Sequence, residues 1–283
     1  MNSVQELVAS TEKLLCLPSV YQHIRALLDD PTSTSADLSA VVGSDPAIAA
    51  RVLQVANSPL YGAPGQISHI DRAVTLMGLQ RVHDLALTSM VLGLFSEIQG
   101  GPLQGFRENA LYRALAARSS ARCLGVGDPD RLFVEGLLAD IGHLVMYQAD
   151  PTQRERTTHW ARTHHCPLAD AEQTLLGFNF AEVGATLACR WALPRGFAAA
   201  IGAQLHPARG GPHATEAALI HVANALLESH QETDAEHPAD LDAQALARVD
   251  PLCALYLELD IPLMAGIRKQ TEQDLTLARG LLH

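Results

Sequence analysis

Apolar residues recur along most of this chain at the spacing of an α-helix. In one segment the apolar face is formed by Ile48, Val52 and Val55. Residues 79–95 are apolar on nearly all sides, which predicts a buried helix. No stretch alternates at period two for long enough to indicate a strand. The pattern therefore predicts an all-α fold.

The predicted helices are short, and residues that favour turns separate them. Proline, glycine, asparagine and serine stand between the periodic segments, where they end one helix and begin the next. The expected helices cover residues 4–15, 18–29, 35–42, 46–57, 69–77, 79–95, 105–124, 129–148, 151–165, 167–176, 180–191, 195–204, 213–230, 243–258 and 262–281.

A segment rich in glycine and polar residues, 96–104, predicts a boundary between two lobes of the helical bundle. We expect an N-terminal helical lobe over residues 1–98 and a second helical lobe over residues 104–230. Residues 231–283 should form an acidic loop followed by helices that pack on the core.

The charge of the chain argues against nucleic acid as a partner. Lysine and arginine total 20 against 31 aspartate and glutamate residues, which gives a formal net charge of -11. An acidic chain repels a phosphate backbone unless basic residues form a local patch, and here the arginines are scattered.

Cysteine usage and the N-terminus indicate a cytoplasmic protein. The five cysteines are widely spaced and form no C-x-x-C pair, so the sequence does not predict a zinc knuckle or a redox motif. The N-terminus lacks the basic region and apolar run of a signal peptide. No apolar segment approaches the ~20 residues that a membrane span needs, so we expect no membrane association.

Asp140 is the most informative residue for function. It interrupts an apolar segment, and a buried carboxylate must be paired, protonated or bound to a metal. In hydrolases that hold a metal with a His-Asp doublet, histidine precedes the aspartate, but here Ala139 does. His143 follows three residues later on the same predicted helical face. There it could coordinate the same ion as Asp140, or simply form a salt bridge with Asp140. The pairing is the simpler interpretation.

Three stretches of sequence, taken together, are specific enough to compare with a known family. The first joins Ser-Asp-Pro at 44–46 to Asn-Ser-Pro-Leu-Tyr-Gly at 57–62 and continues to Met-Gly at 77–78. The second is Gly-Leu-Leu-Ala-Asp-Ile-Gly-His-Leu at 136–144, and the third lies within residues 172–194. The chain thereby resembles the HD-related output domain (HDOD) family of bacterial signalling proteins over roughly residues 15–230.

The resemblance implies a fold similar to that of HD phosphohydrolases, which gather metal ligands from separate helices. Those ligand positions would fall at Ala114, Ala139, Asp140, Phe180, His206 and Asn224, with His143 beside them. Only Asp140 and His206 keep a strong metal-binding group, whereas a metal that activates water needs about three protein ligands. The resemblance therefore predicts a degenerate HD-like core with a vestigial site and neither a metal nor another cofactor.

The function implied by the resemblance is noncatalytic signal transduction. We expect a regulatory module that binds bacterial signalling proteins or a small ligand. The sequence leaves open whether the chain forms a homo-oligomer. The alternative is an enzyme, either a metal-dependent HD phosphohydrolase or a cyclic-dinucleotide phosphodiesterase. It would use Asp140, His143, His206 and further histidines as an atypical ligand set.

A loop formed by Asn57, Ser58, Pro59 and Tyr61 is the candidate for a groove between the lobes. These residue types also serve turns for purely local reasons, which is the simpler interpretation. A partner surface is the alternative.

Overall fold

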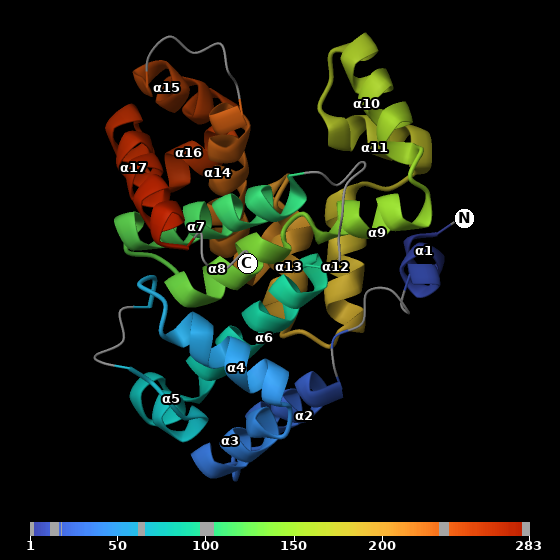
Figure 1. Cartoon of the computed structure of the whole chain (residues 1–283). Helices are drawn as coiled ribbons and strands as arrows, with labels where there is room; N and C mark the ends of the chain where they lie inside the picture. The colour runs from blue at the N-terminus through green and yellow to red at the C-terminus, as the bar shows by residue number, and fades with distance from the viewer. Residues whose placement is uncertain are drawn as a thin grey trace. The chain divides into compact units, whose positions relative to one another are not determined.

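The structure is a computed structural model that describes residues 3–11, 17, 19–61, 66–96, 105–231 and 238–278 (Figure 1). Every regular element in these residues is a helix, so the predicted all-α fold is confirmed. The chain divides into two compact units. The larger unit holds residues 1–16 and 99–271, and the smaller unit holds residues 17–98 and 272–283.

Among its described residues, the smaller unit holds five whole helices and the last turns of α17 (Ile261–Ala278), and α6 lies at its centre. The helices are α2 (Ser19–Asp29), α3 (Ser35–Gly43), α4 (Pro46–Ala56), α5 (Ile70–Met77) and α6 (Leu79–Ser96). Helix α6 packs against the other four, as its apolar sequence predicts. Its polar residues His83 and Asp84 are buried and pair with each other, with 2.8 Å between Nδ1 and Oδ1. Tyr21 contacts the other ring nitrogen of His83 at 3.2 Å.

The larger unit is built around α7, which is buried along most of its length. Its helices are α1 (Val4–Thr11), α7 (Phe106–Leu124), α8 (Pro129–Leu138), α9 (Ile141–Ala149), α10 (Gln153–His164), α11 (Leu168–Leu176), α12 (Phe180–Arg190), α13 (Arg195–Ala203), the 3-10 helix η2 (Pro207–His213), α14 (Ala214–Gln231), α15 (Pro238–Arg248), α16 (Pro251–Tyr256) and α17 (Ile261–Ala278), whose last turns belong to the smaller unit. Figure 1 shows α10 and α11 as a hairpin, with α14 to α17 gathered together.

Helices α7 and α8 approach each other closely because small residues face across their contact. A Cβ on Gly136 of α8 would lie only 2.8 Å from the Cα of Ala114 on α7. Helix α7 also packs against α14, while α12 packs against both α9 and α13. The side chains of α7, α9, α12 and α14 therefore converge inside this unit.

Two predicted helices are each divided in the structure. The predicted helix over 129–148 is wrong at Asp140, where α8 ends and α9 begins. The predicted helix over 243–258 is wrong at Asp250, whose carboxylate caps α16 just before Pro251. The predicted ends at 12–15 and 279–281, the boundary segment 97–104 and the acidic residues 232–237 lie outside the described residues.

The break at Asp140 follows from how α9 packs on α12. Gly142, in the first turn of α9, lies so close to α12 that a Cβ there would meet the carbonyl oxygen of Phe180. This contact sets the direction of α9, and the backbone tightens so that the His143 N–H bonds to the Asp140 carbonyl. The spacing of apolar residues contains no sign of such a contact.

Within the part of the chain that the structure describes, every helix is too short or too polar to cross a lipid bilayer.

The Gly142→Ala substitution should strongly destabilise the protein. The new methyl group would collide with the backbone of α12, which cannot move aside as a flexible side chain could. We expect the free energy of unfolding, measured by urea denaturation, to fall by about 3 kcal/mol.

Gly266→Ala in α17 is the matched control. It is a helical and exposed glycine, and nothing lies within 4 Å of a Cβ added there. Alanine should leave stability unchanged or raise it by up to about 1 kcal/mol. Equal effects of the two substitutions would contradict the packing of α9 on α12 described above.

Candidate functional site

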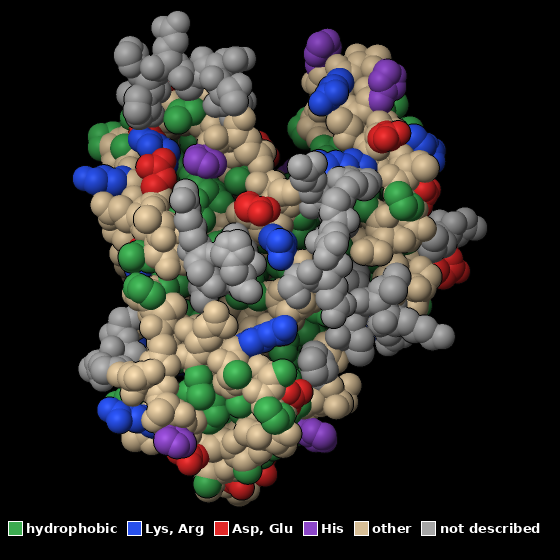
Figure 2. Space-filling model, viewed as in Figure 1, with side chains coloured by type: hydrophobic (Ala, Val, Ile, Leu, Met, Phe, Trp, Pro, Cys, Tyr) green, Lys and Arg blue, Asp and Glu red, His purple; other side chains and the backbone are tan. Residues whose placement is uncertain are grey.

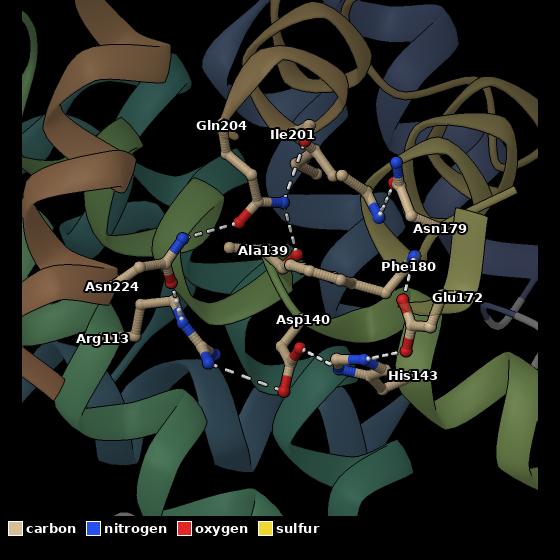
Figure 3. A network of polar contacts seen from close by, with 11 residues as sticks. Arg113, Ala139, Asp140, His143, Glu172, Asn179, Phe180, Ile201, Gln204 and Asn224 are labelled. Atoms are coloured by element: carbon tan, nitrogen blue, oxygen red, sulfur yellow. Dashed lines mark hydrogen bonds and ion pairs between the residues drawn. The ribbon is translucent and has the colours of Figure 1, made fainter. Parts of the chain in front are cut away.

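Asp140 lies at the junction of α8 and α9 and forms ionic contacts with both of its carboxylate oxygens (Figure 3). Its Oδ1 is 2.5 Å from Nδ1 of His143, one turn further along α9. Its Oδ2 is 3.5 Å from Nη2 of Arg113, which projects from α7. The carboxylate that the sequence singles out is thus held between two cationic groups.

His143 links Asp140 to a second buried carboxylate. Its Nε2 is 2.8 Å from Oε1 of Glu172 on α11, a residue with no exposed surface. The other oxygen of Glu172 accepts a hydrogen bond of 3.0 Å from the backbone N–H of Phe180, at the start of α12. Both ring nitrogens of His143 face carboxylate oxygens, and an imidazolium, which donates from both nitrogens, satisfies both contacts.

The break between α8 and α9 leaves a backbone carbonyl that a second set of polar side chains satisfies. The His143 N–H bonds to the Asp140 carbonyl, which leaves the buried Ala139 carbonyl without a partner in its own helix. Nε2 of Gln204 donates to that oxygen over 2.7 Å. Oε1 of Gln204 in turn accepts from Nδ2 of Asn224 over 2.9 Å. A helix irregularity is thereby compensated by a buried amide, as buried polar groups require.

Asn224 connects these contacts to Arg113 through a hydrogen bond. Its Oδ1 accepts a hydrogen bond of 2.6 Å from Nε of Arg113. We call the set Arg113, Asp140, His143, Glu172, Gln204 and Asn224 the polar network (Figure 3). Its members come from α7, the α8–α9 junction, α9, α11, the end of α13 and α14.

The charges of the polar network stabilise one another. Burial, the largest influence on His143, favours its neutral form, but Asp140 and Glu172 outweigh burial and raise the pKa of the ring to about 10. Burial also works against the Asp140 carboxylate, yet His143 and Arg113 hold its pKa below the usual range. The guanidinium and imidazolium balance the two carboxylates, so the network is neutral as a whole.

Two aromatic rings stack on the imidazole ring of His143. The ring of Phe180 stacks on it with 4.3 Å between centroids, and the ring of Tyr147 stacks with 5.3 Å. The electron-rich face of an aromatic ring attracts a cation that stacks on it. Phe180, which occupies a predicted ligand position, thus contributes a ring face to the network.

The residues at the predicted metal-ligand positions do not fit a metal ion. Ala114 and Ala139 are wholly buried and carry no ligand atom, and Asn224 is engaged with Arg113. His206 is exposed at the start of η2 and is not a member of the polar network. Among the described residues, no group of three His, Cys, Asp or Glu side chains is arranged to hold a metal.

Sequence reasoning missed three members of the polar network. Arg113 lies within a buried apolar run of α7, and Glu172 is a buried charge on α11. A charged residue in an otherwise apolar helix face signals a partner, which could have drawn attention to both. The sequence gives no indication of the role of Gln204, because its side chain satisfies the Ala139 carbonyl that the break between α8 and α9 leaves without a helical partner.

The loop proposed as a groove lies in the smaller unit, where Asn57 organises the turn. Its Nδ2 donates to the carbonyls of Leu53 and Ile67, and its Oδ1 accepts from the Ile67 N–H over 2.7 Å. Ser58 bonds to the carbonyl of Val55, and Pro59 is exposed. These contacts give Asn57 a structural role in joining α4 to the segment before α5.

A cavity of about 320 Å³ opens beside the polar network in the larger unit. Arg113, Asp140, His143, Phe180 and Asn224 form part of its wall. Further side chains from α7, α9, α10, α11, α14 and α15, with Pro167 and Leu205, complete the wall. The network is thus one wall of a space that a small molecule could enter.

Proteins of known structure and sequence share this fold. A candidate phosphohydrolase from Shewanella amazonensis SB2B is 25% identical, with a TM-score of 0.76 and 98% of each chain covered. A candidate signal transduction protein from Marinobacter aquaeolei VT8 is also 25% identical, with a TM-score of 0.68. The match covers 96% of this chain and 60% of that one.

One curated relative, an uncharacterized protein from Treponema pallidum (strain Nichols), is 25% identical over 182 residues. The match covers 63% of this chain but 35% of the Treponema protein, so this chain corresponds to about a third of that protein's length. An HDOD domain protein of unknown function from Geobacter sulfurreducens shares the fold, with a TM-score of 0.63 at 24% identity.

The family model for the HDOD domain matches residues 14–207, which include Arg113, Asp140, His143, Glu172 and Gln204 of the polar network. With this match over more than half of the sequence, the chain belongs to the HDOD family.

Proposed function

We propose that this protein is a noncatalytic regulatory module of the HDOD type. The observation that carries the proposal is the contact of Arg113 with Asp140, the carboxylate that would hold a metal in an HD phosphohydrolase. A fixed guanidinium and an imidazolium already neutralise this carboxylate. A divalent cation placed there would be repelled by both cations and would gain no ligand from Ala139 or Ala114.

A role in signalling is supported by the family and by one relative's description. The HDOD match and the Marinobacter chain, described as a signal transduction protein, both favour regulation through binding. We propose that the module binds a bacterial signalling protein or a small ligand, and that it can act as a homo-oligomer. The chain has a formal net charge of -11, and basic and acidic side chains are interspersed on the face drawn in Figure 2, so we propose no nucleic acid as partner.

The alternative of a phosphohydrolase is favoured by the description of the Shewanella relative. Metal content and turnover separate the two functions. The purified protein should hold no stoichiometric manganese, iron or zinc by plasma mass spectrometry. It should also fail to hydrolyse bis-p-nitrophenyl phosphate or a cyclic dinucleotide in added manganese. Stoichiometric metal together with turnover that Asp140→Ala abolishes would establish the enzyme instead.

The Arg113→Met substitution should destabilise the protein by about 3 kcal/mol, because it leaves a buried carboxylate without its guanidinium. Adding Asp140→Asn to it should restore part of the loss, since the charge that lacks a partner is then removed. Urea denaturation of the single and double variants measures this coupling.

The exposed pair of Arg25 and Asp29 on α2 is the control for the buried pair. Arg25→Met should lower the free energy of unfolding by about 0.5 kcal/mol or less, as exposed ion pairs do. Strictly additive effects of Arg113→Met and Asp140→Asn would show that the two residues do not interact.

Stability should depend on pH through His143. Its pKa is about 10 in the folded protein against 6.5 ordinarily, so its contribution is complete below about pH 6.5 and is lost as pH rises toward 10. Asp140, with a lowered pKa, contributes above about pH 4 and loses its contribution below that. Urea denaturation should therefore show greatest stability between these limits. His143→Gln should flatten the decline between pH 7 and 10, and an unchanged decline would show that His143 is not the group responsible.

A further inference from the structure

The cavity beside the polar network gathers positive charge in an acidic protein. Its charged lining residues are Arg113, His143, Arg154 and Arg248 against Asp140 and Glu228. With His143 protonated, these are four cationic groups against two anionic ones, and Glu172 behind His143 adds a third carboxylate, so an excess of one positive charge remains although the whole chain has a formal net charge of -11. This local excess favours an anion inside the cavity.

Arg113 carries a donor that the polar network does not use. Its Nε bonds to Asn224 and its Nη2 faces Asp140, but its Nη1 is buried and makes no hydrogen bond with any described residue. The side chain is 8% exposed and lies in the cavity wall. Because Nη1 itself is covered, the Arg113 guanidinium acts on an anion in the cavity through its positive charge.

Two further arginines reach the cavity from other helices. Arg154 of α10 is exposed, and its guanidinium carbon lies 5.7 Å from the centre of the Tyr147 ring. Arg248 of α15 lies 3.6 Å from Glu228 of α14. Three guanidinium groups on α7, α10 and α15 thus border one space, and guanidinium matches the geometry of carboxylate and phosphate.

The rest of the wall suits a planar group. Phe106, Tyr147 and Phe180 line the cavity together with the amides of Asn109 and Gln231. Aromatic faces stack on a ring, and amides can hydrogen-bond to its edge. The volume of about 320 Å³ lies at the lower end of the ~300–1,000 Å³ of ligand pockets, so one small molecule fits better than a peptide.

We propose that this cavity binds a small anionic molecule that carries one carboxylate or phosphate group on a planar ring system. The oxyanion is held by Arg113, Arg154 and Arg248, and the ring lies against the aromatic part of the wall. The inference deepens the proposed function, on which it rests, by giving the chemical class of the regulatory ligand.

Isothermal titration calorimetry with four probes tests the proposal. Adenosine 5′-monophosphate and benzoate carry a ring with a phosphate or a carboxylate, whereas adenosine lacks the anion and inorganic phosphate lacks the ring. One or both ring-bearing anions should bind more tightly than adenosine and inorganic phosphate, and more weakly at high salt. The tighter of the two identifies the oxyanion that the site prefers.

Variants of Arg154 and Arg248 test whether the probe binds in this cavity. Arg154→Gln and Arg248→Gln should each weaken binding of the preferred probe about tenfold, the effect of one charge-assisted hydrogen bond. Arg162→Gln is the control, because Arg162 is also exposed on α10 but does not line the cavity. Circular dichroism of each variant checks that it is folded.

The proposal is overturned if neither ring-bearing anion binds at millimolar concentration, if adenosine binds equally well, or if both arginine variants bind unchanged. Release of inorganic phosphate from adenosine 5′-monophosphate would instead overturn the noncatalytic function while leaving the binding site in place. The two proposals therefore fail separately.

Discussion

The neutralisation of Asp140 is the interaction on which the rest of the larger unit depends. A carboxylate at a buried helix junction is costly unless cations and donors surround it. Arg113 reaches it from α7 and His143 reaches it from α9, and each of them is fixed by a further partner. Through Glu172 and Asn224 the same charge connects α11, α12 and α14 to the α8–α9 junction.

In the proposed noncatalytic module, this arrangement neutralises buried charge as a bound metal ion does in an HD phosphohydrolase. A metal would draw ligands from several helices toward one point and neutralise their charge. Here the cations belong to the protein, and their partners lie on the same converging helices. Asp140 and Glu172 raise the pKa of His143 against the effect of burial, and the rings of Phe180 and Tyr147 stack on its imidazole. In the proposed noncatalytic module, this ion-pair network connects the converging helices, and polar groups of the network line the adjacent cavity.

The sequence predicts the helices well because apolar periodicity is a local property, and it singles out Asp140 because a charge in an apolar segment is conspicuous. It misses the break at Asp140, since the cause is the contact of Gly142 with α12. It also misses the roles of Arg113 and Glu172, whose partners Asn224 and His143 lie 111 and 29 positions away. No local pattern connects residues so far apart. The expected site residue His206 lies elsewhere, because Gln204 takes the inward position.

The protonation state of His143 tests the central claim most directly. Nitrogen-15 NMR of the labelled imidazole ring distinguishes an imidazolium from a neutral or metal-bound ring. The network predicts that His143 keeps both protons at pH 8 and that its ring nitrogen shifts do not change when zinc or magnesium is added. A neutral His143 at that pH, or ring shifts that move with the metal, would contradict the account.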